Sequence, residues 1–215
     1  MCGKITGFAT AIAVLSVLLV CLSADARMIP NGGFELPILP VPGYQQLTPT
    51  AWIGGRQNLL FKTPPSDPLT TWPLAYTGEQ YATPGNANAS TGQAYLYQDF
   101  NVDSPGPYAF TWYANAGHSG GFTTSPYVVT ISQEGQPLFS RDYDAYSDAL
   151  NWNQESVLVD LGKGSCRLAF TGSPINAGLN PLIDDVSANV VPEPAAMLAA
   201  AAILGLAVTR PRRHR

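Results

Sequence analysis

Residues 108–116 read YAFTWYANA, and the order of their side chains predicts a β-strand with one apolar face. Tyr108, Phe110 and Trp112 occupy the even positions of this stretch, whereas Ala109 and Thr111 occupy odd positions. Because successive side chains of a strand point to opposite faces, the three large aromatic side chains share one face. A strand of this kind fits a sheet that buries one face and leaves the other more polar.

Six further segments of the same kind are separated from one another by turn sequences. They are rich in Tyr, Phe, Val and Thr, which favour strands, and they read AYLYQDFNV (94–102), YVVTISQEG (127–135), PLFSRDY (137–143), SVLVDLG (156–162), CRLAFTG (166–172) and LIDDVSANVV (182–191). The turn sequences SPGP, EGQP and GKGS stand between neighbouring segments. Short alternating strands with such turns predict an all-β fold, an antiparallel β-sandwich.

The region 36–78 differs from the rest of the chain because it is rich in proline and irregular. Proline lacks the backbone N–H that a central strand needs, so this region predicts long loops. One short strand is expected within it, NLLFK at 58–62.

The amino-terminal 26 residues have the order of parts typical of a secretory signal peptide. Lys4 precedes the apolar run IAVLSVLLVCL at 12–22, and Ala24-Asp25-Ala26 is a small-residue cleavage pattern. An uncut signal anchor is the weaker alternative, because the run is short for a hydrocarbon core of about 30 Å. We therefore expect signal peptidase to cut after Ala26, which leaves one exported domain at 27–190.

Charge and cysteine content narrow the possible partners of this domain. Between residues 27 and 191 there are thirteen acidic and six basic side chains, a balance that argues against nucleic acid as a partner. Cys2 and Cys21 lie in the signal peptide, so the mature chain keeps only Cys166 and no internal disulfide is expected. Cys166 alternates with Leu168 and Phe170 on one strand face, which favours a buried thiol over a reactive one.

Four short motifs give the domain its resemblance to a known family. NGGFE opens it at 31–35, GEQYA stands at 78–82, YQDF lies within a strand at 97–100, and LIDDVS closes it at 182–187. Together they resemble the galactose-binding-like jelly rolls, a fold shared by several carbohydrate-binding modules and by many exported bacterial proteins. The resemblance spans 31–190 and implies that the first and last strands lie together.

This resemblance also implies a structural calcium ion between the first and last strands. Carried over by residue, it points to Glu35 and Asp185, with Asp184 as the alternate ligand. Calcium prefers six to eight oxygen ligands, and carboxylates suit it well. The alternative for the Asp-Asp pair is a solvated strand end without a metal.

Aromatic side chains in the proline-rich loops are the candidates for a glycan platform. Sugar rings stack on exposed Trp or Tyr faces, so Trp52 and Trp72 are the residues that the sequence suggests. The alternative is that the sandwich buries them. A carbohydrate-binding module that recognises matrix glycans is therefore one candidate function.

Catalysis has little support in the sequence. The domain has one histidine, His118 in AGHSGG, with no metal-ligand spacing beside it, and it has no G-x-S-x-G motif. Nothing selects a catalytic pair among its carboxylates. We therefore expect a protein that is not an enzyme.

The carboxyl-terminal segment 191–215 reads VPEPAAMLAAAAILGLAVTRPRRHR and has three parts. Pro192-Glu193-Pro194 is held extended by its prolines. The apolar run 195–209 would form a helix of about 22 Å, too short for a comfortable permanent span of a core of about 30 Å. The basic tail 210–215 would stay on the cytoplasmic side.

These parts, in this order and at the terminus, resemble the PEP-CTERM sorting signal of Gram-negative bacteria. The resemblance implies recognition by an exosortase, a transient state in the inner membrane, and delivery to the cell surface or extracellular matrix in association with exopolysaccharide. The sequence thus predicts an exported envelope or matrix protein, with glycan binding as the alternative molecular role.

Overall fold

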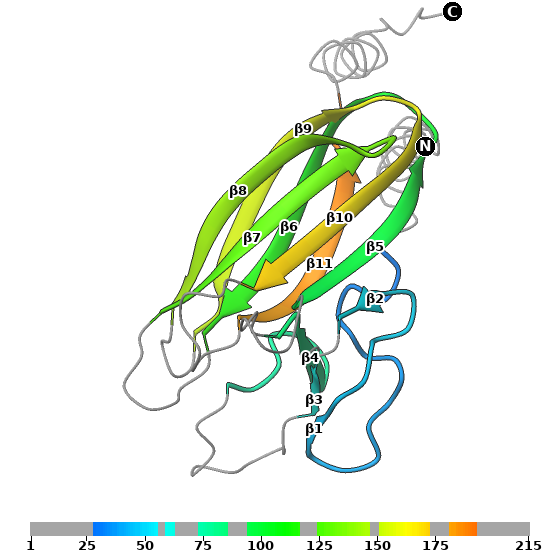
Figure 1. Ribbon diagram of the computed structural model, residues 1–215. Helices are drawn as coiled ribbons and strands as arrows, with labels where there is room; N and C mark the ends of the chain where they lie inside the picture. The colour runs from blue at the N-terminus through cyan, green and yellow to red at the C-terminus, as the bar shows by residue number, and fades with distance from the viewer. Residues whose placement is uncertain are drawn as a thin grey trace, which may run out of the picture. The chain divides into compact units, whose positions relative to one another are not determined.

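The computed structural model describes residues 28–55, 59–62, 73–85, 94–116, 124–146, 151–172 and 181–192, and these form two antiparallel sheets packed face to face (Figure 1). The predicted signal peptide at 1–26, the glycan-binding candidate Trp72, the lone histidine His118 and the predicted sorting segment from Glu193 onward lie outside the described residues. Residues 27–190 form one compact unit.

The first sheet has six strands in the order β1-β3-β4-β11-β6-β9. Their bounds are Gly43–Gln45 (β1), Leu59–Lys62 (β3), Gln80–Thr83 (β4), Leu182–Val190 (β11), Gly106–Asn115 (β6) and Asn153–Leu161 (β9). The second sheet has five strands in the order β2-β5-β10-β7-β8. Their bounds are Ile53–Gly54 (β2), Tyr95–Val102 (β5), Gly164–Gly172 (β10), Thr124–Gln133 (β7) and Gln136–Tyr146 (β8).

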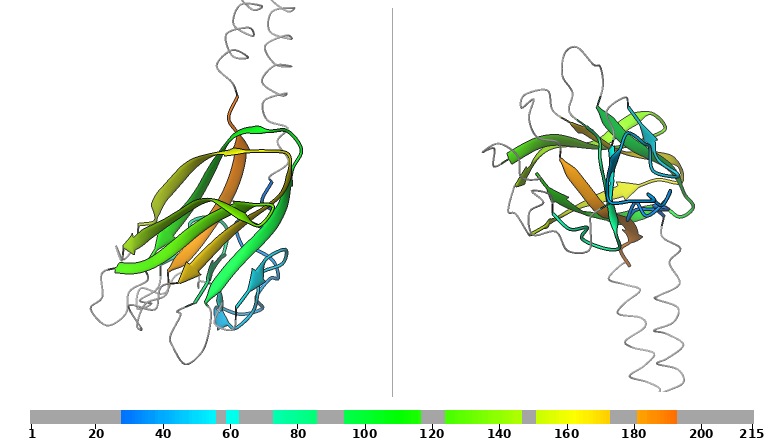
Figure 2. Two further views of the ribbon diagram at one scale, coloured as in Figure 1. Left: turned by 45° about the horizontal axis from the view of Figure 1, so that its top comes forward. Right: turned by 90° about the horizontal axis from the view of Figure 1, so that it is seen from below.

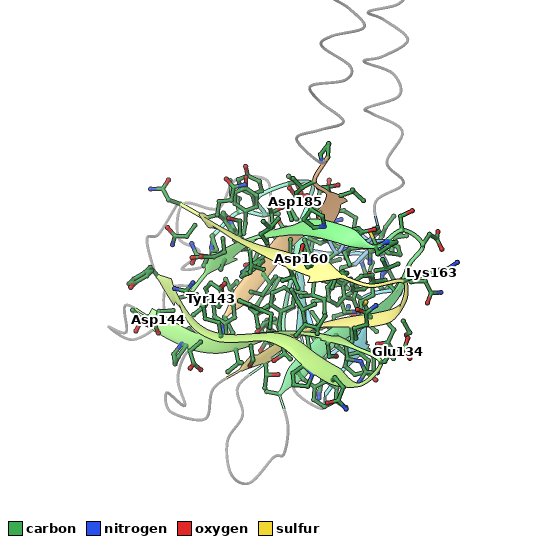
Figure 3. All side chains as sticks on the ribbon, turned by 90° about the horizontal axis from the view of Figure 1, so that it is seen from above. Glu134, Tyr143, Asp144, Asp160, Lys163 and Asp185 are labelled. Carbon is green, nitrogen blue, oxygen red and sulfur yellow. The ribbon has the colours of Figure 1, made fainter. Side chains whose placement is uncertain are left out.

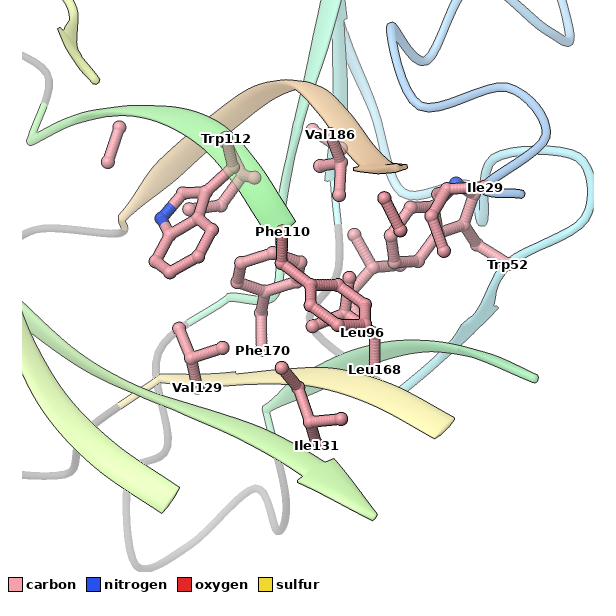
Figure 4. Close-up of a cluster of buried hydrophobic side chains, with 14 of the residues drawn as sticks. Ile29, Trp52, Leu96, Phe110, Trp112, Val129, Ile131, Leu168, Phe170 and Val186 are labelled. Atoms are coloured by element: carbon pink, nitrogen blue, oxygen red, sulfur yellow. The ribbon is translucent and has the colours of Figure 1, made fainter. Parts of the chain in front are cut away.

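The main core lies between the two sheets and follows the predicted alternation of side chains. In β6, Phe110 and Trp112 are buried, as are Val129 and Ile131 in β7 and Phe170 in β10 (Figure 4). Trp112 donates a hydrogen bond to the Tyr127 hydroxyl at 2.9 Å, which satisfies its only polar group inside the core. The predicted antiparallel β-sandwich is therefore confirmed.

A second, smaller apolar cluster lies on the outer face of the six-stranded sheet. Phe61, Tyr81 and Leu182 form it, and Trp152 packs against it. The Phe61 and Tyr81 rings stack with their centroids 5.1 Å apart. Because of this cluster, β4 is covered on both faces and all four of its residues are buried.

All seven long strands predicted from the alternating segments are present, and the short strand expected at 58–62 is β3. The prediction missed β1, β2 and β4, which are two to four residues long. Two or three residues cannot show an alternation, and β4 is buried on both faces, so its sequence does not alternate either. Within the described ranges there is no helix long and apolar enough to cross a membrane.

The first motif and the last strand come together, as the resemblance implied. The N–H of Val186 in β11 donates to the Gly32 carbonyl at 2.9 Å. A Cβ at position 32 would lie 1.9 Å from the Val186 carbonyl oxygen, so only glycine allows this approach. Between Asp184 and Ser187 the register with β6 shifts, and Asp185 adopts a φ of 44° in this bulge.

Candidate functional site

Asp184, one of the predicted calcium ligands, is fully buried and binds backbone N–H groups. Its Oδ2 accepts hydrogen bonds from the N–H groups of Tyr76 and Thr77 at 2.8 and 3.1 Å. Its Oδ1 accepts a hydrogen bond from the N–H of Asp185 at 2.7 Å. Burial raises the pKa of Asp184 to about 8, although the three hydrogen bonds favour the ionised form.

Glu35, the predicted calcium ligand near the start of the domain, binds the same loop a few residues after Tyr76 and Thr77. Its Oε1 accepts hydrogen bonds from the N–H groups of Glu79 and Gln80 at 2.9 and 3.0 Å. Gly78 lies so close to this carboxylate that a Cβ there would be 2.2 Å from Oε1. Asp184 and Glu35 together therefore hold residues 76–80 through four backbone N–H groups.

These hydrogen bonds use both oxygens of Asp184 and one oxygen of Glu35. N–H donors present partial positive charge to both carboxylates, where a cation would need free oxygens. Among the described residues, no three His, Cys, Asp or Glu side chains lie close enough together to hold a metal. Calcium binding through Glu35, Asp185 and Asp184 stays a prediction that a melting experiment decides.

Trp52 is a core residue, which corrects its assignment as an exposed glycan platform. Only 5% of it is exposed, and its ring packs 5.1 Å from Phe34 and 6.2 Å from Phe170. Its Nε1 donates to the Asn31 carbonyl at 3.2 Å. Figure 4 shows Trp52 beside Ile29 in this core. A proline-rich neighbourhood therefore did not mean exposure, because the loop folds over the open end of the core.

Aromatic and charged side chains gather instead on the outer face of the five-stranded sheet. Tyr95 and Tyr97 lie on one face of β5, with their ring centroids 5.7 Å apart. The Arg167 guanidinium of β10 lies flat against Tyr97, with Cζ 3.8 Å from the ring centroid. Arg167 also pairs with Asp99 of β5 through two hydrogen bonds, from Nε at 2.7 Å and from Nη2 at 2.9 Å.

The strand register explains why these four side chains meet. Arg167 faces Asp99 directly across the β5–β10 pair, and Ala169 faces Tyr97. The small Ala169 side chain leaves room for the Arg167 side chain to reach the Tyr97 ring. About 45% of each side chain in the ion pair is exposed, so both are accessible to a ligand. The hydrogen bonds to Asp99 raise the pKa of Arg167, and it stays charged.

A hollow of about 430 Å³ adjoins this ion pair. Its lining residues come from β5, from the end of β7, from the β7–β8 turn and from the start of β10. They are Asp99, Ser132, Glu134, Gly135, Ser165, Cys166 and Arg167. The Cys166 side chain points into the core and is 2% exposed, as the alternation predicted. The hollow therefore offers polar side chains and backbone rather than a reactive thiol.

Two turns at the rim of the hollow are tied to each other. Gln133 accepts a hydrogen bond from the Gly162 N–H and donates one to the Gly162 carbonyl, at 2.9 and 2.7 Å. Glu134 accepts one from the Ser165 N–H at 3.0 Å. The end of β7 and the β7–β8 turn are therefore linked to the β9–β10 turn by three hydrogen bonds at the rim of the hollow.

This face, which we call the tyrosine–arginine face, consists of Tyr95, Tyr97, Asp99, Arg167 and the adjoining hollow. It offers two half-buried aromatic rings for stacking. It also offers a carboxylate beside a guanidinium that has further N–H donors beyond the two that bind Asp99. The sequence contained the signal for the two tyrosines, which alternate within AYLYQDFNV. The ion pair was missed because Asp99 and Arg167 are 68 residues apart, and only the register joins them.

The fold is an antiparallel β-sandwich of two sheets (Figure 2), and solved proteins of different kinds share it. The carbohydrate-binding module TmCBM61, solved in complex with β-1,4-galactotriose, superposes with a TM-score of 0.52 at 14% identity, covering 78% of this chain and 100% of that one. The Stig cyclase FisC from Fischerella sp. TAU, solved with an indole ligand, gives a TM-score of 0.55 at 18% identity and covers 75% of this chain and 95% of its own.

A second cyclase from Fischerella sp. TAU, in complex with 4-(1H-indol-3-yl)butan-2-one, gives a TM-score of 0.53 at 18% identity, with 79% of this chain and 100% of that chain covered. No protein-family profile and no curated protein sequence matches this chain. At these identities the likeness concerns the fold alone, and the fold hosts both binding modules and enzymes. The function of this chain therefore depends on the side chains of the tyrosine–arginine face.

Proposed function

We propose that this protein binds a glycan along β5 and β10, on the tyrosine–arginine face. The observation that carries the proposal is the Arg167 guanidinium, which is stacked on Tyr97 and paired with Asp99 beside the hollow. Fold similarity to a carbohydrate-binding module is consistent with this role.

The parts of the face match the chemistry of a sugar ring. A pyranose has an apolar face of C–H groups, which stacks on an aromatic ring, and a rim of hydroxyls, each both a donor and an acceptor. Tyr95 and Tyr97 supply the rings, Arg167 supplies donors and Asp99 supplies acceptors. Because Asp99 and the turns already hold these groups in place, little side-chain freedom is lost on binding.

Binding fits the hollow better than catalysis does. Its two carboxylates are both engaged, Asp99 by Arg167 and Glu134 by the Ser165 N–H. Such groups suit hydrogen bonding to hydroxyls, whereas a general acid needs a proton that it can release. We therefore expect no release of reducing ends when the protein is incubated with a glycan that it binds.

The proposal is tested by affinity electrophoresis and calorimetry of the mature protein against a panel of neutral plant and bacterial polysaccharides. Tyr97→Ala and Arg167→Lys should each weaken binding at least tenfold, because the first removes the ring and the second removes the planar fork. Tyr44→Ala is the matched control, since Tyr44 is 65% exposed on β1 of the other sheet. If no polysaccharide of the panel binds, the proposed function is wrong.

We further propose that the protein reaches its site of action through its PEP-CTERM tail. The order of the Pro192-Glu193-Pro194 motif, the apolar run 195–209 and the basic tail 210–215 supports this delivery, together with the signal peptide at 1–26. An exosortase would cut near the motif, and the released sandwich would then meet extracellular polysaccharide.

A further inference from the structure

Among the residues that the structure describes, the charged side chains around the tyrosine–arginine face are mostly acidic. Asp99 and Glu134 line the hollow, and Asp142 and Asp144 are exposed on β8 of the same sheet. Figure 3 shows Glu134 and Asp144 toward opposite ends of β8. Asp142 pairs with Val128 of β7 in the register, so it lies on the outer face together with Thr130 and Ser132.

Arg167 is the one basic side chain lining the hollow, and it is already neutralised by Asp99. Lys163 belongs to the β9–β10 turn and does not line the hollow. Arg141 stands next to Asp142 in sequence, but it points to the other face of β8, where its Cζ lies 5.3 Å from the Tyr143 ring centroid. Among the described residues that line the hollow, there is therefore no second basic side chain to offset Glu134 when an anionic sugar enters.

We infer that this face selects uncharged glycans and rejects polymers that carry carboxylate or sulfate groups. The inference rests on the proposed function, since the stacking residues and the hollow define the site and the charges decide which glycan it accepts. An uncharged sugar can form hydrogen bonds with the Asp99–Arg167 pair without breaking it. An anionic sugar would have to break that pair or bear the repulsion of the remaining carboxylates.

The repulsion between the acidic side chains and a charged polymer grows with the number of charged sugars, which strengthens the selection for uncharged glycans. Asp142 on β8 lies two strand spacings, about 10 Å, from β10. This exceeds the Debye length of about 8 Å at physiological ionic strength but is well within the length of about 30 Å at 0.01 M salt. Each charged residue of a bound chain adds its own repulsion, so the discrimination should be large at low salt and shrink as salt is added.

The experiment compares one neutral polysaccharide with its own oxidised form. The neutral polymer with the tightest binding in the panel is oxidised at its primary hydroxyls, which converts CH₂OH groups to carboxylates and leaves the backbone unchanged. Both forms are titrated against the mature protein at 0.01 M and 0.5 M salt, together with native polyuronates. We expect the oxidised polymer to bind at least tenfold more weakly at low salt, and the difference to narrow at high salt.

The double variant Asp142→Asn, Asp144→Asn isolates the role of charge. It should bind the neutral polymer like the unaltered protein and recover part of the lost affinity for the oxidised polymer. Equal binding of both forms, or tighter binding of the polyuronates, would overturn the charge selection while leaving glycan binding intact. If no polymer of either kind binds, it is the proposed function that fails.

Discussion

Asn31 joins three separate parts of the chain through its side-chain amide and backbone. Its Nδ2 donates to the carbonyls of Leu36 and Thr50 at 2.8 and 3.0 Å, and its Oδ1 accepts from the Leu36 N–H at 3.0 Å. Its φ of 52° is one that asparagine tolerates better than most residues. The first residue of the NGGFE motif therefore organises the loop that closes the core over Trp52.

Replacing Asn31 with alanine should lower the free energy of unfolding by about 2–3 kcal/mol, because three hydrogen bonds are lost and two carbonyls lose a partner. Urea denaturation of the mature protein measures the change. Asn189→Ala is the matched control on the exposed end of β11 and should have an effect near zero. Equal stability of the two variants would show that the Asn31 hydrogen bonds do not stabilise the fold.

Trp52 offers a direct test of its burial. Trp52→Ala should destabilise the protein by about 3–5 kcal/mol, since it empties a site between Phe34 and Phe170. Trp52→Phe should fold and bind glycan with unchanged affinity, because the ring does not reach the tyrosine–arginine face. Loss of glycan binding in well-folded Trp52→Phe would restore Trp52 as a ligand-contacting residue.

Asp184 should make stability depend on pH. Burial raises its pKa from 3.8 to about 8 on folding, so between these values the folded state holds a proton that the unfolded chain releases. The free energy of unfolding should therefore fall as the pH rises from about 5 to 8. Urea denaturation at several pH values checks this, and Asp184→Asn should flatten the slope. An unchanged slope in that variant would mean that another group is responsible.

Among the elements, the loop at 76–80 shows how two carboxylates can hold a segment through its backbone N–H groups. Glu35 and Asp184 reach it from opposite ends of the domain sequence and bind four of its N–H groups. Tyr76, held in this way, stacks against Tyr113 of β6. Here both carboxylates act as hydrogen-bond acceptors for the backbone of the loop.

The melting temperature of the mature protein in calcium and in chelator tests the calcium ion that the resemblance implies beside this loop. A ligand that binds only the folded state raises its stability, so calcium binding would appear as a higher melting temperature with calcium. Differential scanning calorimetry measures both conditions. A rise of several degrees with calcium would show that loop 76–80 rearranges and that Glu35 and the Asp184–Asp185 pair hold the predicted ion.

The long strands could be predicted from the sequence because each carries its own alternation. Tyr108, Phe110 and Trp112 mark the buried face of β6 without reference to any other strand. The candidate site could not be predicted in the same way, since the Asp99–Arg167 pair depends on which strands are neighbours and in what register. Trp52 was misplaced because its burial depends on Asn31 and Phe34, which fold the loop from a distant position.

At the scale of the whole molecule, we propose that the two ends of the chain carry the sorting signals and that the sandwich carries the binding site. Mass spectrometry of the protein from its native host tests this division. We expect a mature chain that begins at Arg27 and ends near the Pro192-Glu193-Pro194 motif. An intact carboxyl terminus would contradict the proposed sorting and would leave glycan binding as a separate question.

The central position of β11 would have a mechanical consequence for a protein that the proposed sorting attaches to a matrix. β11 lies between β4 and β6, and its pairs with β6 run from Leu182 to Val190, the end from which the chain leaves the compact unit. Hydrogen bonds of antiparallel strands run perpendicular to the strand direction. A force along β11 therefore loads many of its hydrogen bonds at the same time and does not open them one by one. Tension between the carboxyl end and a bound polymer would then be distributed over the whole sheet.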